Sequence, residues 1–552
     1  MATTFETDYL ILGAGPAGLQ LAYFLQRAGR RYVVLDGADH VGAFFSRYPR
    51  HRTLLSINKS ATGRDDPEFN LRHDWNSLIS EDASGRMTEL TQEYFPSADV
   101  LVDYLARFVR ANELQVHLER RVTSVRREDG QGSFEAECEG GQRYRARCLV
   151  VATGVGTPVI PDVPGIELAE GYETMSVDPA EFHNKNVLIL GKGNSAFETA
   201  DNLIPTAAVI HMLSPHPVTL AWDSRFVGHL RAVNNNFLDT YHLKSQNGII
   251  DGNVQGMERT DTGKIRVSFS SIHAANEVEQ IEYDAVLRCT GFRFDRSIFD
   301  ETCLPELSEC GRLPTMSTGF ESSNVPGLFF AGTVTQFLDH KRAQSAFIHG
   351  FRYNTESLAG LLAERYHQDP LPSIEVEPTG GALAEAFLAR MNRVSSLWQQ
   401  VGFLADMIVL PKEPGGTARY IFSHPYDYLV EHGAKISEGR DFYILMFRLG
   451  DNPPNPHDYD RSTNVYDGAS STNIHPVVEM RSGTDGARRS EFHVLEDFLA
   501  DWSGREYLGP CAEYFERSMR GDTLEAKADP VRRLIVRDKD MRLVDASQGM
   551  GK

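Results

Sequence analysis

The stretch that most constrains this chain runs from Tyr9 to Gln20, where an apolar run opens into the pattern Gly-x-Gly-x-x-Gly. Only glycine lets a strand turn sharply into a helix and bring bare backbone close to a pyrophosphate. A second apolar run, residues 32–35, ends at Asp36, whose carboxylate can accept hydrogen bonds from ribose hydroxyls. The combined pattern predicts a dinucleotide-binding unit and disfavours the alternative, an ordinary strand–helix–strand unit that binds no ligand.

A second unit of strand, glycine turn and helix lies at residues 187–200. Ala196 stands in place of its third glycine, which is an allowed small-residue variant. The next strand ends near Ser214 without a carboxylate, and an acid at this point favours NAD. The missing acid therefore favours NADPH over NADH. The preference is small, because no arginine that could pair with a 2′-phosphate follows the strand directly. Ser214 and His216 are equally compatible with a simple turn.

Two short signatures mark where the chain crosses between these units. Ala152-Thr153-Gly154 follows the strand at 144–151, and Thr290-Gly291 follows the strand at 284–289. We predict an α/β protein with two Rossmann-like domains, the second inserted in the first, and a mixed or helical C-terminal region. The expected boundaries are residues 1–165 and 320–366 for an FAD-binding domain, 166–319 for an NAD(P)H-binding domain, and 367–552 for a cap or oligomerisation region.

Composition narrows the classes of partner. The formal net charge is −20 and no run of Lys or Arg occurs, which disfavours nucleic acid and acidic membranes. The six cysteines are scattered without a Cys-x-x-Cys pair, so neither a zinc site nor a dense disulfide framework is expected. From the cysteine pattern we also expect no bound metal. Neither a signal peptide nor a bilayer-length apolar stretch is recognisable, so we expect a cytoplasmic protein.

Three motifs carry a resemblance to a known family: residues 71–78 (Leu-Arg-His-Asp-Trp-Asn-Ser-Leu), 190–200 and 347–353 (Phe-Ile-His-Gly-Phe-Arg-Tyr). The chain resembles the two-dinucleotide-binding flavoproteins, including class B and N-hydroxylating flavin monooxygenases. The likeness is strongest to the branch of the endoplasmic-reticulum flavoprotein associated with degradation. That branch is lumenal, with a signal peptide and a retention tail that we do not recognise here.

The resemblance and the glycine patterns together imply the cofactor site. The aromatic and arginine side chains between residues 41 and 52 suit contacts with a flavin, and a helix over 342–365 would point its N-terminus at the flavin pyrimidine. Thr333 stands where an aspartate is common in the family. The expected cofactor-binding residues are Gly13, Gly15, Pro16, Ala17, Gly18, Asp36, Gly37, Phe45, Arg47, Arg52, Trp75, Val122, Ala152, Thr153, Gly154, Gly191, Gly193, Asn194, Ser195, Ala196, Ser214, His216, Thr290, Gly291, Gly332, Thr333, Gln344 and Ser345.

FAD and a nicotinamide cofactor together imply hydride transfer. A disulfide reductase would need a dithiol near the flavin, and no suitable cysteine pair is present, so O2 is the simplest acceptor. The expected function is a monooxygenase that uses flavin C4a-hydroperoxide chemistry to N-hydroxylate an amino acid or another small amine. Ketone oxygenation is less favoured, because residues 172–186 lack Phe-x-Gly-x-x-x-His. The catalytic candidates are Arg52, Asn58, Lys59, Trp75, Asn235 and Lys341.

Two other functions stay open: a flavin-bearing protein that binds a polypeptide partner, and a reductase of a separate redox protein. The C-terminal region adds a further choice between a cap or dimerisation element, which would make a homodimer, and a lid over the substrate. Its apolar spacing predicts helices over 383–409 and 493–502, and strands at 420–422 and 442–447.

Overall fold

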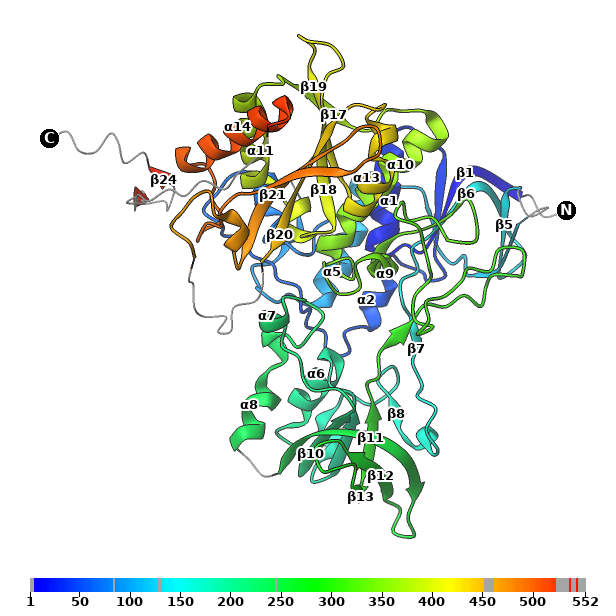
Figure 1. Ribbon diagram of the computed structural model, residues 1–552. Helices are drawn as coiled ribbons and strands as arrows, with labels where there is room; N and C mark the ends of the chain where they lie inside the picture. Colours follow the sequence, from blue (N-terminus) through cyan, green and yellow to red (C-terminus); the bar gives the residue numbers. More distant parts are fainter. Residues whose placement is uncertain are drawn as a thin grey trace.

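The computed structural model describes residues 4–82, 85–127, 132–243, 246–450 and 461–522, and two short strands at 536–537 and 543–544. Figure 1 shows a larger upper body, which contains two sheets, and a smaller lower body built on a third sheet. The chain runs through the lower body between two passages through the upper one. The fold class is therefore α/β, with the second dinucleotide unit inserted in the first, as the sequence predicts.

The first sheet has the strand order β3-β2-β1-β6-β5-β4, and β16 pairs with the end of β6. Its strands are β1 (Thr4–Leu12), β2 (Tyr32–Leu35), β3 (Val116–His117), β4 (Val122–Arg127), β5 (Phe134–Cys138), β6 (Arg143–Val151) and β16 (Leu328–Phe330). The helices that complete it are α1 (Pro16–Arg27), α5 (Ala98–Ala111) and α10 (Ile348–His367). β2 is buried along its whole length, and its residues are aromatic or aliphatic. This composition is typical of a parallel strand that is covered on both faces. Since β16 comes from residue 328, this sheet closes only after the inserted unit is complete.

The second sheet has the order β13-β12-β11-β10-β9-β14-β8. Its strands are β8 (Glu170–Gly171), β9 (Asn186–Leu190), β10 (Val209–Ser214), β11 (Asn247–Arg259), β12 (Ile265–Ser271), β13 (Val278–Tyr283) and β14 (Ala285–Arg288). Helix α6 (Asn194–Leu203) follows β9 directly. The two connections to the first domain lie side by side, because β7 (Thr157–Pro158) pairs antiparallel with β15 (Phe292–Arg293).

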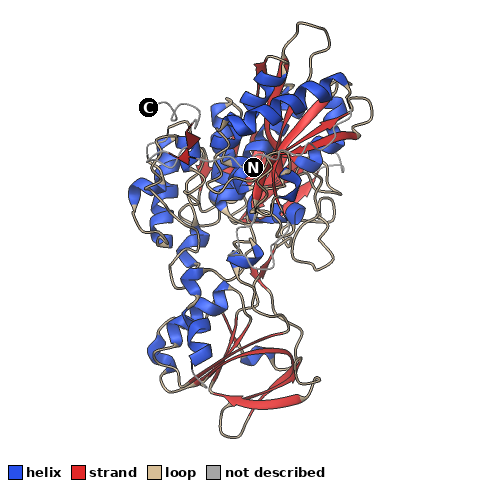
Figure 2. Ribbon diagram, turned by 60° about the vertical axis from the view of Figure 1, so that its left-hand side comes forward, coloured by secondary structure: helices blue, strands red, loops and turns tan. Residues whose placement is uncertain are grey.

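The C-terminal region contains a six-stranded antiparallel sheet of order β17-β19-β18-β20-β21-β22, seen in red at the upper right of Figure 2. Its strands are β17 (Ser373–Val376), β18 (Leu404–Val409), β19 (Ala418–Pro425), β20 (Phe442–Leu449), β21 (Ile474–Arg481) and β22 (Arg488–His493). The main helices here are α11 (Gly380–Arg393), α13 (Tyr426–Ile436) and α14 (Arg505–Arg520). Shorter elements elsewhere are α2 (Ala43–Arg47), α3 (Pro67–Asn70), α4 (Met87–Leu90), α7 (Ala221–Ser224), α8 (Asn236–Leu243), α9 (Gln336–Asp339), α12 (Ser396–Gln399), β23 (Val536–Arg537) and β24 (Leu543–Val544).

Two predicted helices of this region are corrected. In place of one helix over 383–409, α11 ends at Arg393. The last six residues of the predicted range, 404–409, form β18, which is buried on both faces. The helix predicted over 493–502 is wrong, since β22 ends at His493 and α14 begins at Arg505. The Asp497 carboxylate accepts hydrogen bonds from the N–H groups of Leu499 and Asp501, and such local bonds compete with those of a helix. The strands predicted at 420–422 and 442–447 are confirmed in β19 and β20.

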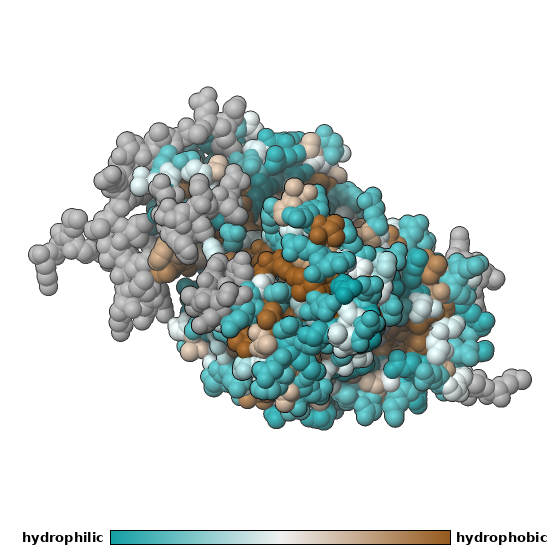
Figure 3. Space-filling view, turned by 90° about the horizontal axis from the view of Figure 1, so that it is seen from below, coloured by the Kyte–Doolittle hydropathy of each residue, from teal (hydrophilic) through white to brown (hydrophobic). Residues whose placement is uncertain are grey.

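The face shown in Figure 3 is mostly hydrophilic, with apolar side chains in smaller groups. In the described part of the chain, no helix combines the length and apolar character needed to cross a bilayer. Nor does any cluster of His, Cys, Asp and Glu in that part have the make-up of a metal site.

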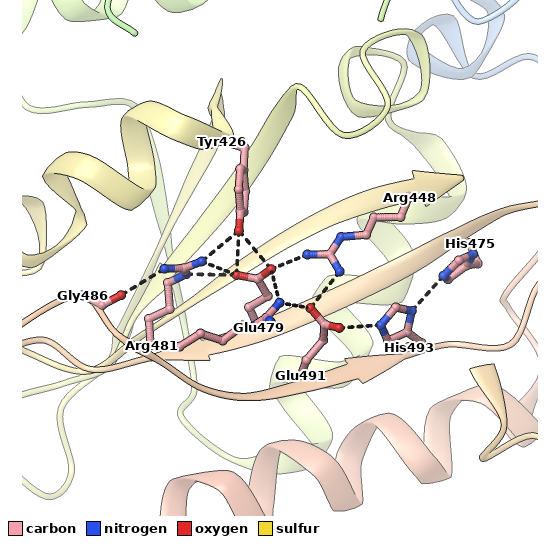
Figure 4. A network of polar contacts seen from close by, with 9 residues as sticks. Tyr426, Arg448, His475, Glu479, Arg481, Gly486, Glu491 and His493 are labelled. Carbon is pink, nitrogen blue, oxygen red and sulfur yellow. Dashed lines mark hydrogen bonds and ion pairs between the residues drawn. The ribbon is translucent and has the colours of Figure 1, made fainter. Parts of the chain in front are cut away.

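A buried ionic network ties β20, β21 and β22 together (Figure 4). Glu479 is fully buried and accepts hydrogen bonds from Arg481 Nε at 2.9 Å and from Arg481 Nη2 at 2.7 Å. Arg448 pairs with Glu479 and also with Glu491, at 2.7 Å. Because every one of these charges has a partner, the network ties the three strands together.

We predict that Glu479→Ala lowers the free energy of unfolding of the C-terminal region by about 3 kcal/mol, because it leaves the Arg481 guanidinium buried without its carboxylate. Denaturant unfolding followed by circular dichroism measures this. The control is Glu438→Ala, whose side chain is 75% exposed and should change little. Equal stability of the two variants would contradict this role of the network.

Candidate active site at the domain junction

The first glycine loop is shaped by two close contacts. Gly13 has φ +104°, and a Cβ there would lie 2.8 Å from the Ala152 carbonyl oxygen. A Cβ on Gly18 would lie 2.0 Å from the carbonyl oxygen of Gly13. A Cβ on Gly15, in contrast, would meet no protein atom within 4 Å. Packing therefore requires Gly13 and Gly18, whereas Gly15 leaves open space at the N-terminus of α1, where a phosphate fits.

Asp36, at the end of β2, closes the ribose side of this loop. Its carboxylate accepts hydrogen bonds from the backbone N–H of Ala14 at 2.7 Å and of Ala38 at 2.9 Å. Each oxygen keeps a further lone pair for a ribose hydroxyl. Gly37 packs against Arg121, and the next residue, Val122, begins β4, which pairs with β5 at the other edge of the sheet.

The second glycine loop repeats this arrangement in the inserted domain. Gly191 has φ +124°, and its Cβ would lie 2.3 Å from the Cys289 carbonyl oxygen, while a Cβ on Gly193 would meet nothing within 4 Å. Ala196 is fully buried, and Ser195 lies in the first turn of α6. Both loops therefore offer bare backbone and a helix N-terminus to one dinucleotide each.

The Asn194 side chain is committed to the protein. Its amide nitrogen donates to the carbonyl oxygens of Gly228 and His229, and its oxygen accepts from Arg231 N–H at 3.0 Å. Asn194 thus positions the loop and can bind a cofactor only through its backbone.

Lys192 is a residue that the sequence reasoning missed. Its Nζ donates to the carbonyl oxygens of Ser214 at 3.2 Å and His216 at 3.1 Å, and it pairs with Asp251. A cation therefore lies at the end of β10, where the adenosine ribose binds in this type of fold. Its place between the two glycines is its only signal in the sequence, because its partners lie on the neighbouring strands β10 and β11.

An aromatic stack lies where the two dinucleotide domains meet. The His349 ring, in the first turn of α10, stacks on Trp75 with centroids 4.3 Å apart and on Phe347 with centroids 5.8 Å apart. The Arg231 guanidinium, from the inserted domain, lies 5.2 Å from the Trp75 ring. Three distant segments thus build one wall. The sequence analysis quoted residues 347–353 but assigned them no role.

Polar atoms of this wall have no partner among the described residues. Both ring nitrogens of the fully buried His349 are without one, and so are Arg231 Nε, Asn58 Oδ1 and Gln344 Oε1. Buried polar groups are normally hydrogen-bonded, so such a cluster marks a place built to receive a polar ligand. Burial, with the nearby charges of Arg352 and Arg231, holds the pKa of His349 well below its ordinary value. The neutral ring offers one donor and one acceptor, which suits the polar edge of a flavin.

Helix α10 begins at Ile348, not at 342 as predicted. The backbone N–H of Gln344 donates to Gln400 Oε1 and that of Ser345 to Asp339 Oδ2, so both amides are already used. His349 is the side chain that the helix N-terminus presents.

Gly332 connects this wall to the first glycine loop. It has φ +81°, and a Cβ there would lie 2.7 Å from the Ala17 side chain, close to Pro16 at the start of α1. The Thr333 hydroxyl donates to the Ala346 carbonyl oxygen at 3.1 Å. Thr333 therefore supports the segment before α10 instead of presenting a carboxylate.

The structure brings only part of the catalytic candidates together. Trp75 is in the stack, and Asn58 joins its segment through a β-bridge with Asp74. Arg52 instead pairs with Asp99 at the start of α5. The other positions lie outside the wall: Lys59, Asn235, Lys341 and Arg47 are exposed, and Phe45 packs in α2. Ala152, Thr153, Gly154, Thr290 and Gly291 lie on the two connections between the domains.

These two glycine loops and the wall between them define a two-dinucleotide-binding flavoprotein. A family model described as "Pyridine nucleotide-disulphide oxidoreductase" matches residues 10–332. The chain belongs to this family, and it is a flavin-dependent oxidoreductase that uses FAD and a pyridine nucleotide. It is 36% identical to the mouse (Mus musculus) protein named FAD-dependent oxidoreductase domain-containing protein 2, over 94% of this chain and 85% of the mouse protein.

Solved structures agree on the fold. A flavin-containing monooxygenase from Stenotrophomonas maltophilia matches with a TM-score of 0.50 and 19% identity, covering 65% of this chain and 99% of that one. The bacillithiol disulfide reductase Bdr (YpdA) from Bacillus cereus matches with a TM-score of 0.50 and 20% identity, covering 65% of this chain and 99% of that one. At this identity the likeness concerns the fold alone.

We predict that Gly15→Val abolishes flavin binding, because its side chain enters the open space at the start of α1, and that Gly193→Val keeps flavin but loses reduction by NADPH. Flavin absorbance and anaerobic reduction measure these effects. Gly509→Val is the control, since a Cβ at Gly509 also meets no protein atom, on a helix far from both loops in sequence. A yellow Gly15→Val protein would contradict this assignment.

A hydrogen-bonded relay links the two domains beside the site. The Tyr172 hydroxyl accepts from the Arg50 backbone N–H at 2.9 Å and donates to the buried Glu198 carboxylate on α6. Burial raises the pKa of Glu198 to about 7, against a smaller lowering by the Tyr172 hydrogen bond. Since the unfolded carboxyl titrates near its ordinary value of 4.5, the folded protein binds more protons between these two values, and its stability falls as pH rises through them.

We predict that Glu198→Gln removes this loss. Relative to wild type, the variant should gain about 2–3 kcal/mol in free energy of unfolding between about pH 5 and about pH 8. Unfolding at both pH values measures it, with the exposed Glu167→Gln as the control. The assignment would be refuted if the difference in free energy of unfolding between wild type and Glu198→Gln were the same at both pH values.

Proposed function

We propose that the protein is an FAD- and NADPH-dependent monooxygenase that N-oxygenates a small amine, such as an amino acid. The observation that carries the proposal is the neutral His349 ring at the junction of the domains, which stacks with Trp75 and Phe347 and has no hydrogen-bond partner among the described residues. Trp75 and Phe347 would exclude water there, and the His349 ring would hold a bound polar group by one donated and one accepted hydrogen bond.

When bound, FAD and NADPH supply the hydride transfer and the electron pair with which O2 can be cleaved. In the overall reaction, amine, O2, NADPH and a proton give hydroxylamine, NADP⁺ and water: one oxygen atom goes to the nitrogen and the other to water. The chain's own part is to bind, to orient and to keep the junction dry.

The cysteines favour oxygen over a disulfide as the acceptor. All six are free, and five are buried. Cys289 comes nearest to the second glycine loop, and burial raises the pKa of its thiol to about 12, which leaves it protonated and unreactive. The preference for NADPH rests on the lack of a carboxylate directly after β10, because Lys192 is already paired with Asp251 and bonded to two carbonyl oxygens. A cytoplasmic location is part of the proposal and agrees with the free thiols.

We predict that purified yellow protein oxidises NADPH faster when its amine substrate is added, and that the product gains one atom from isotope-labelled O2. His349→Ala should lower kcat by about 10²-fold, because it removes the hydrogen bonds at the junction. His183→Ala, on the exposed surface, is the matched control. Unstimulated turnover across a broad amine panel, or acceleration only by an added disulfide or redox protein, would overturn the proposal.

A further inference from the structure

A cavity of about 380 Å³ lies between α10, the segment 67–86 and the C-terminal sheet. Its lining includes Leu71, Ile79, Phe422, Glu356 and Arg390 but none of the residues of the aromatic stack. Its volume falls within the range of small-molecule sites. The cavity is therefore separate from both glycine loops. Residues 71–79 lie between it and the Trp75 side of the domain junction.

Arg390, one of the cations that line the cavity, is already paired. Arg390 donates to Asp406 Oδ2 at 3.0 Å, to Glu68 Oε1 at 2.6 Å and to Ser423 Oγ at 3.1 Å. Each of its three nitrogens is therefore used, and two carboxylates share one guanidinium. An anionic ligand would find this cation already committed.

Glu356 is the group that lacks a partner. It forms no hydrogen bond or ion pair with any residue in the described ranges, although it lines the cavity. Its side chain is exposed on the cavity side, while the surrounding protein is close enough that burial raises the pKa of its carboxyl to about 7, against a smaller opposing effect of Arg390. Arg86 in the lining and Arg352 on α10 donate to backbone carbonyl oxygens, and Arg390 is used by Asp406 and Glu68. The Glu356 carboxylate is therefore left for a ligand that brings its own cationic hydrogen-bond donor.

One further lining group points to a ligand. His424 is buried, its Nδ1 bonds with Ser357 Oγ at 2.8 Å, and its Nε2 has no partner among the described residues. Leu71, Ile79 and Phe422 give the wall an apolar part, while serines and charged side chains line other parts of it. Such a cavity suits a molecule with one cationic end and a hydrocarbon body.

We propose that this cavity binds a small organic ammonium ion, with its ammonium group on the Glu356 carboxylate and its hydrocarbon part against Leu71, Ile79 and Phe422. A metal cation would need several oxygen ligands together and would leave the apolar wall uncovered. The site is independent of the reaction at the domain junction. Helix α10 carries both Glu356 and His349, and the loop 71–79 carries both Leu71 and Trp75. A molecule bound in the cavity would therefore touch elements that also form the aromatic wall at the domain junction.

Calorimetric titration of the FAD-loaded protein with benzylamine, which is cationic near neutral pH, tests the proposal, with benzyl alcohol and benzoate as neutral and anionic probes of similar shape. Benzylamine should bind saturably, and at least about tenfold more tightly than the other two. Glu356→Gln should weaken benzylamine binding by about tenfold or more, whereas Glu385→Gln, exposed on α11, should leave it unchanged.

A second variant tests the cavity without touching the charge. Ile79→Trp fills the apolar wall and should abolish binding, while Glu356 stays in place. The proposal is overturned if benzoate or benzyl alcohol binds as well as benzylamine, if Glu356→Gln binds like wild type, or if none of the probes binds saturably. Thermal unfolding of each variant verifies that a loss of binding is not a loss of fold.

Discussion

The contact between the backbone of Gly18 and the carbonyl oxygen of Gly13 is the constraint on which the first dinucleotide site depends. A methyl group at Gly18 would lie 2.0 Å from that oxygen, so α1 can start directly at the end of β1 only with glycine there. Gly191 meets the Cys289 carbonyl oxygen in the same way in the inserted domain. Because these close contacts fix each loop, Gly15 and Gly193 are left facing open space, and two phosphate sites arise in a single chain.

The C-terminal region supports the segment that leads into the junction of the two domains. The Gln400 side chain accepts a hydrogen bond from Gln344 N–H, and donates to Ser345 Oγ at 2.9 Å and Asn354 Oδ1 at 2.6 Å. It therefore holds the segment that leads into α10 and to His349. Arg225 of the inserted domain donates to the carbonyl oxygens of Gly450 and Thr472, so all three sheets are joined around the junction.

The sequence predicted what depends on local pattern. Residues that are close in sequence determine the glycine loops, the strands beside them and the return of the chain at β16. The two cofactors follow from these features. The aromatic wall at the domain junction could not be predicted, because Trp75, Arg231 and His349 meet only through tertiary packing. Lys192 was missed for the same reason: its partners Ser214 and Asp251 reach it across neighbouring strands. Local side-chain bonds of Asp497 likewise overrode an apolar spacing that resembled a helix.

The central claim is that one chain holds two dinucleotides in positions that allow electrons to pass from one to the other. Anaerobic titration of the purified yellow protein with NADPH tests it most directly. The two sites predict that about one equivalent of NADPH bleaches the flavin absorbance, since each nucleotide delivers one hydride to one flavin. A protein that binds no flavin, or one whose bound flavin stays oxidised with NADPH in excess, would contradict the claim.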